Sequence, residues 1–108
     1  MIRGLLIAVG AVLVLGASAP VSTALTLSSR QDITNGRELY VNAGCPACHG
    51  DRAQGFIGPR LAGLRLSYDD ALTVLREPSG GMLRYDESAV SGEEFLDIYT
   101  YLRDLGGL

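Results

Sequence analysis

The sequence lacks or nearly lacks several residue types that usually carry function. It has no lysine and no tryptophan, one histidine, two cysteines and two methionines in 108 residues. Its nine basic side chains are therefore all arginines, and they face twelve acidic ones for a formal net charge of −3. No stretch gathers these arginines into a basic patch, so nucleic-acid binding is not expected. With one histidine, every scheme that needs two imidazoles within the chain is excluded.

The N-terminus is typical of an export signal. Residues 1–24 combine a basic start at Arg3, an uncharged apolar run over 5–15, and small residues after it. The apolar run is shorter than the ~20 residues that span a bilayer. Cleavage is predicted after Ala24, because cleavage after Ala19 would leave a proline at the new terminus. The alternative is an uncleaved anchor at the inner membrane, and either way the predicted location is the periplasm.

The rest of the chain predicts a single all-α domain. Residues 25–31 are expected to form a loose lead-in, and residues 32–108 the domain itself. Helices are predicted over 30–43, 68–77 and 92–105, and each is preceded by a serine with an acidic residue three positions later. Residues 44–63 are rich in glycine and contain two prolines, so a loop is predicted there. So short a domain is marginal for building a core from side chains alone, and a buried cofactor is expected.

The cysteines and the histidine form one motif. Cys45, Cys48 and His49 have the spacing Cys-x-x-Cys-His, which is the pattern of c-type haem attachment. Two thiols three residues apart on a tight turn can each form a thioether with a porphyrin vinyl group. The next residue then presents its imidazole to the iron from the same side. The predicted cofactor is one covalently bound haem c.

Three other interpretations of the motif are open. A thioredoxin-like dithiol also uses Cys-x-x-Cys, but in a βαβ setting that this sequence does not show. A structural zinc site needs about four protein ligands, and the motif supplies three. A disulfide across two intervening residues would be strained and would stabilise little. Haem attachment is the favoured interpretation, and the dithiol is the second.

The second axial ligand is predicted by elimination. His49 is the only histidine, and Met82 is the only methionine outside the export segment. Met82 lies in a glycine-rich loop, where a short segment can approach the porphyrin face closely. A lone methionine often fills a gap in a core instead. The loop and the vacant ligand position favour coordination, and His/Met ligation raises the potential of haem iron relative to two histidines.

Residues 32–105 resemble the class I cytochrome c family, in its small bacterial periplasmic branch with one haem. The resemblance is carried by Gly36 and Tyr40 of the first helix with Ile98 and Tyr101 of the last, by Gly58-Pro59-x-Leu61-x-Gly63, and by Arg76-Glu-Pro78-Ser-Gly-Gly-Met82. It implies a cytochrome c-like fold, three main helices around one haem. It also implies that the Pro59 carbonyl accepts a hydrogen bond from the Nδ1–H of His49, which orients the imidazole.

Two positions depart from the family pattern. Leu83 stands where a proline often follows the methionine, which bears on the rigidity of the Met82 loop. The segment from Tyr40 to Cys45 is one residue longer than the commonest spacing. Arg60, Arg65 and Tyr68 are candidates for hydrogen bonds to the haem propionates.

The predicted function is one-electron transfer, without enzymatic activity and without a small-molecule substrate. The expected partners are redox proteins: a periplasmic dehydrogenase, an oxidase or a membrane complex. One alternative is a cytochrome subunit within such a dehydrogenase or oxidase complex. An alternative of another class is a haem peroxidase or gas sensor with an open sixth site, which requires that Met82 does not bind the iron.

Overall fold

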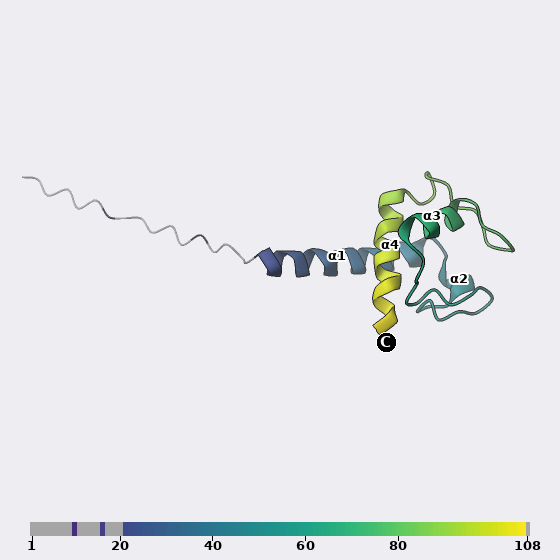
Figure 1. The fold of residues 1–108 in the computed structure, drawn as a ribbon, viewed down its shortest axis with the longest axis horizontal. Helices are drawn as coiled ribbons and strands as arrows, with labels where there is room; N and C mark the ends of the chain where they lie inside the picture. Colours follow the sequence, from purple (N-terminus) through teal and green to yellow (C-terminus); the bar gives the residue numbers. More distant parts are fainter. Residues whose placement is uncertain (1–9, 11–15, 17–20, 108) are drawn as a thin grey trace, which may run out of the picture.

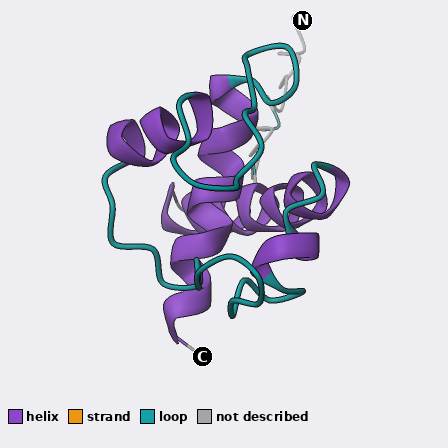
Figure 2. Cartoon of the chain, turned by 90° about the vertical axis from the view of Figure 1, so that its right-hand side faces the viewer, coloured by secondary structure: helices purple, strands orange, loops and turns teal. Residues whose placement is uncertain are grey.

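The computed structural model describes residues 21–107, together with Gly10 and Gly16. It contains four α-helices: α1 (Val21–Asn42), α2 (Pro46–His49), α3 (Tyr68–Arg76) and α4 (Gly92–Asp104). A short 3₁₀ turn, η1 (Leu105–Gly107), follows α4. Over residues 21–107 the chain forms helices and loops and no strand (Figures 1 and 2). The predicted all-α class is confirmed.

The domain is built on the crossing of α1 and α4 (Figure 1). At the crossing, a Cβ on Gly36 would lie 2.0 Å from the carbonyl oxygen of Asp97. Only glycine lets the two backbones approach this closely. One turn further along α1, the Tyr40 ring lies 5.7 Å from that of Tyr101. The Asn35 amide donates a 2.6 Å hydrogen bond to the Asp97 carboxylate and closes the other side of the crossing.

Helix α1 begins earlier than the sequence predicted. The expected lead-in 25–31 is helical, and the helix passes through Ser29, which the prediction had placed as its N-cap. The physical reason is that residues 21–35 contain neither glycine nor proline. The serines and threonines among them cost less than ~0.7 kcal/mol each in a helix, too little to stop one. The first turns of α1 extend beyond the other helices in Figure 1.

The apolar core lies where α4 packs on α1 and α3. Helix α4 buries Phe95, Ile98, Tyr99, Tyr101 and Leu102. Its start is the predicted capping box, in which Ser91 Oγ accepts from the Glu94 amide and the Glu94 carboxylate accepts from the Ser91 amide. Helix α3 also starts at a serine cap, with Ser67 Oγ accepting from the Asp70 amide. Ala71 and Leu75 are the buried residues of α3.

The region predicted as a loop over 44–63 contains one helical element. Helix α2 is a single turn, and its first residue is Pro46. Proline is well suited to that position because its fixed φ matches the helix and the first amide needs no partner. The glycines and prolines of this segment indicate a loop, and the single helical turn within it was not predicted.

The predicted export segment falls almost entirely on residues outside the described part of the chain. Only its last four residues, 21–24, belong to α1. Among the helices that the structure describes, none combines the length and the apolar character needed to cross a membrane.

Candidate haem-attachment site

Helix α2 holds the two thiols on one side of a single turn. Cys45 is its N-cap, and the Cys45 carbonyl accepts hydrogen bonds from the amides of Cys48 (3.3 Å) and His49 (2.9 Å). Residues three apart on a helical turn share a face, so the two sulfurs lie on the same side. Both cysteines are free thiols; Cys45 is partly buried and Cys48 is exposed. Two neighbouring thiols of this kind fit the donor set that thioether attachment requires.

The His49 side chain is buried and oriented by a backbone carbonyl. It is 7% exposed, and its Nδ1 lies 2.8 Å from the carbonyl oxygen of Pro59. Because a carbonyl can only accept, Nδ1 carries the proton, and the lone pair of the neutral ring is on Nε2. Nε2 makes no hydrogen bond to any described residue. No fully buried side-chain nitrogen or oxygen in that part of the chain lacks a partner, so Nε2 reaches open space.

The loop after α2 packs tightly against the imidazole. A Cβ on Gly58 would lie 3.0 Å from Cε1 of His49 and 3.1 Å from Nδ1. The Gly58 amide donates to the Cys48 carbonyl at 2.7 Å, and the Gly55 amide donates to the His49 carbonyl at 2.8 Å. The Tyr40 hydroxyl donates to the Gly50 carbonyl at 2.6 Å. The turn that carries the motif is thus fixed from both sides.

The electrostatics around the thiols do not suit a dithiol oxidoreductase. Burial raises the pKa of the Cys45 thiol to about 11. Reactive Cys-x-x-Cys sites lower the thiol pKa instead, since the thiolate is the nucleophile. The βαβ setting of such sites is also absent from residues 21–107.

The zinc interpretation has no support in the geometry. Nowhere in the described part of the chain do three or more His, Cys, Asp or Glu side chains gather into a group able to hold a metal ion. The thiols and the His49 ring therefore do not converge on one point. A porphyrin explains such an arrangement, because its vinyl groups and its iron are separate attachment points.

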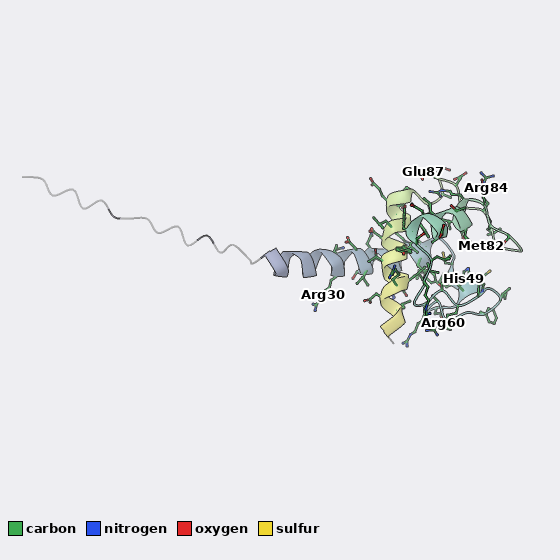
Figure 3. All side chains as sticks on the ribbon, in the orientation of Figure 1. Arg30, His49, Arg60, Met82, Arg84 and Glu87 are labelled. Atoms are coloured by element: carbon green, nitrogen blue, oxygen red, sulfur yellow. The ribbon has the colours of Figure 1, made fainter. Side chains whose placement is uncertain are left out.

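Met82 lies in the loop between α3 and α4, partly buried against the core. Figure 3 labels Met82 and His49, and both lie on the side of α4 away from the first turns of α1. Tyr85 connects the two regions, because its hydroxyl donates a 2.7 Å hydrogen bond to the carbonyl of Ala43, two residues before Cys45. Burial raises the pKa of Tyr85, and the thiols of Cys45 and Cys48 raise it further, as expected for a phenol beside them.

The three candidate propionate residues lie in different environments. Arg60 and Arg65 are exposed, and the Arg60 Nε donates to the Ala62 carbonyl at 3.3 Å. Tyr68 packs against the rings of Phe95 and Tyr99. Its hydroxyl donates to the Gly92 carbonyl at 2.7 Å, so this proton is not available to a propionate. Of the three candidates, the two arginines keep donors facing solvent.

The sequence does not predict the hydrogen bonds that three residues make at the site. Arg76 donates from Nη1 to the carbonyls of Tyr85 (3.0 Å) and Val90 (2.8 Å), and from Nη2 to the Glu87 carboxylate (2.5 Å). Tyr85 and the hydroxyl of Tyr40 are the other two. Tyr40 and Arg76 belong to the motifs that carry the family resemblance, but no local pattern indicates their hydrogen-bond partners. For Tyr85 the only signal is its position as an aromatic residue three positions after Met82.

A surface hollow of about 470 Å³ lies beside the motif. It is lined by Arg37, Val41, Gly44, Pro46, Ala47 and Asp51. Neither His49 nor Met82 borders it, so this hollow is a separate feature from the space that the His49 ring faces.

These features define a class of protein: an all-α domain with two thiols on one turn and a carbonyl-oriented histidine directly after them is a small c-type cytochrome. Residues 31–102, about two thirds of the chain, match the family model for "Cytochrome C oxidase, cbb3-type, subunit III", and the chain belongs to this family. It is also similar to a cytochrome c-553-like protein of Synechocystis, with 29% identity over 79 residues, covering 73% of this chain and 74% of that protein. No solved structure matches it. The chain is an electron-transfer protein whose cofactor is covalent haem c.

Proposed function

We propose that the protein is a one-electron carrier whose haem is attached through Cys45 and Cys48 and whose iron is bound by His49 Nε2 and Met82 Sδ. The observation that carries this proposal is the state of the His49 ring. Its Nδ1 is committed to the Pro59 carbonyl at 2.8 Å, which leaves Nε2 as the metal-binding nitrogen. A histidine held in this way is a more basic and better oriented ligand than a free one.

The haem supplies an iron that alternates between the ferrous and ferric states. The protein residues hold this group and govern access to it. His49 is 7% exposed, so most of its ring is shielded from bulk water, whereas the exposed Cys48 brings the attachment edge to the surface. A redox partner would approach at this edge, through the small and transient interface typical of such encounters. Arg60 and Arg65 have exposed side chains and are the candidates to bind the haem propionates.

We propose that the protein functions in the periplasm. The support is the sequence pattern of residues 1–24, which is typical of an exported protein. The anchored form, with the segment retained, remains the alternative. N-terminal sequencing of the protein purified from an exporting host distinguishes a start after Ala24 from a start at Met1.

A second candidate function is that of a cytochrome subunit in an oxidase or dehydrogenase complex. The observation in its favour is the family match, since the family is described as a subunit of an oxidase. Affinity purification of the tagged full chain from mildly solubilised membranes tests this candidate. Stoichiometric recovery of a larger oxidoreductase subunit supports it, and a monomer that exchanges electrons with several soluble acceptors supports the free carrier.

The ligand assignment is tested by spectroscopy on the full chain, expressed in a host with haem-maturation machinery. The intact mass should show one haem per chain. The ferric protein should show the weak far-red charge-transfer band of methionine-ligated haem, and Met82→Ala should abolish it. Leu83→Ala is the matched control, because Leu83 is the next residue and is 74% exposed. A Met82→Ala spectrum identical to that of the parent protein would refute the assignment and favour an open sixth site. A mass without haem would favour the dithiol.

A further inference from the structure

Hydrogen bonds hold the loop that carries Met82 at one end only. Residues 78–84 make no hydrogen bond to any described residue outside their own segment, whereas the residues that follow are held by several. The Tyr85 amide donates to the Leu75 carbonyl at 3.1 Å. The Tyr85 carbonyl accepts from Arg76 at 3.0 Å. Tyr85 is therefore the first fixed point after Met82.

The hydroxyl of Tyr85 makes a contact of a different kind. Its backbone contacts attach the loop to α3, but the hydroxyl reaches the Ala43 carbonyl at 2.7 Å, 42 residues away in sequence. Ala43 belongs to the turn that leads directly into Cys45 and His49. This hydrogen bond directly links the loop of one candidate axial ligand to the segment of the other.

The tether between this link and Met82 is short. Two residues separate Met82 from Tyr85, so the Cα atom of Met82 lies within ~10 Å of the Cα atom of Tyr85. Leu83, which stands where the family often has proline, does not stiffen this span. A fixed point close to Met82 restricts the positions that the side chain explores once it leaves the iron. It therefore raises the share of time for which the methionine is bound.

We infer that the Tyr85 hydroxyl, through its hydrogen bond to the Ala43 carbonyl, is a positioning group that holds Met82 on the haem iron. This inference rests on the proposed His49/Met82 ligation. Tyr85 itself does not touch the iron. It acts by keeping the methionine loop and the attachment turn at a fixed separation.

The test is competition between Met82 and added imidazole for the ferric haem of the full-length holoprotein. Imidazole binds only when Met82 is off, so its apparent affinity reports the share of protein with the methionine detached. Tyr85→Phe removes the hydroxyl and keeps the ring. We expect imidazole to bind about fivefold more tightly, which corresponds to the ~1 kcal/mol that one hydrogen bond contributes.

Tyr99→Phe is the matched control. The Tyr99 hydroxyl also donates to a backbone carbonyl, that of Leu66 at 2.8 Å, and it accepts from Arg103 Nη1 at 2.9 Å. These bonds join α4 to the loop before α3 and not to the methionine loop. We expect this variant to lower the thermal unfolding midpoint and to leave the imidazole affinity unchanged.

The outcomes separate the inference from the function on which it rests. A change below twofold in Tyr85→Phe, or an equal change in both variants, overturns the inference, since the hydroxyl would then contribute to general stability only. Met82→Ala supplies the other arm and should bind imidazole far more tightly than the parent protein. If Met82→Ala and the parent bind imidazole alike, Met82 is not a ligand, and the proposed ligation fails together with the inference.

Discussion

The substitution Gly36→Ala should separate the two helices on which the domain is built. The new Cβ would lie 2.0 Å from the Asp97 carbonyl oxygen, 2.5 Å from its carbonyl carbon and 2.9 Å from Cβ of Tyr101. Two of these three atoms are backbone, so no side-chain rotation relieves the clash. An ordinary contact begins near 3.4 Å, so α1 and α4 would have to move apart by about 1.4 Å.

The expected cost follows from opposing effects. Replacing a mid-helix glycine by alanine is favourable by up to ~1 kcal/mol through helix propensity. Overpacking in a tightly packed contact usually costs ~1–3 kcal/mol, and a clash with backbone belongs at the upper end or beyond. Movement of the helices would also strain the 2.6 Å hydrogen bond from Asn35 to Asp97. We expect a net loss of ~2–3 kcal/mol, which for a domain of this size lowers the unfolding midpoint by ~10–20 °C.

The assay is thermal unfolding of the holoprotein followed by far-ultraviolet circular dichroism. Thr34→Ala serves as the control, because Thr34 is an exposed position on the same helix. It should be neutral or slightly stabilising. A Gly36→Ala variant as stable as the parent, or more stable, would refute the reasoning, since propensity would then outweigh the close approach at the crossing.

Three further predictions concern the site and the loop that leads to α4. Gly58→Ala should displace the His49 ring, because the new Cβ would lie 3.0 Å from its Cε1. A shift of the His49 ring N–H resonance in the nuclear magnetic resonance spectrum checks this prediction. An unchanged resonance would contradict it. Tyr40→Phe leaves the buried Gly50 carbonyl without its 2.6 Å partner and should cost ~1–3 kcal/mol in chemical denaturation; an unchanged denaturation midpoint would contradict it. Hydrogen bonds from the Ser88 hydroxyl and the Ala89 amide lower the pKa of the Asp86 carboxyl group. The ionised carboxylate therefore stabilises the fold above the unfolded-state pKa, which is ~4. This stabilisation is lost as the pH falls through the lower folded-state pKa. Asp86→Asn should therefore make the free energy of unfolding depend less on pH on the acid side. An unchanged pH dependence would contradict the lowered pKa of Asp86.

The parts of the fold that the sequence predicted are those with a local physical cause. The starts of α3 and α4 are set by Ser67 and Ser91, each bonded to an amide three residues later. Such short-range capping leaves a recognisable pattern in the sequence. The motif at 45–49 is likewise local, because its chemistry depends on neighbouring residues.

The parts that the sequence did not predict depend on context. The start of α1 was placed nine residues late, because residues 21–29 carry no strong helix signal and no breaker. The role of Tyr85 depends on a bond to a residue 42 positions away, and no local pattern records such a contact. The environment of Tyr68 is a similar case, since its partner Gly92 lies 24 positions away.

The unequal fastening of the two ligand segments has a consequence for how the site opens. The segment with His49 is held by hydrogen bonds before, within and after its turn, whereas residues 78–84 make none to described residues outside their own segment. Regions with few such bonds open at the lowest free-energy cost. If His49 and Met82 are the axial ligands, as proposed, thermal opening would therefore begin at the methionine, and ligand exchange would be one-sided. Since the chain has no lysine and no second histidine, the vacated position would then be filled by water or by a small molecule from solution.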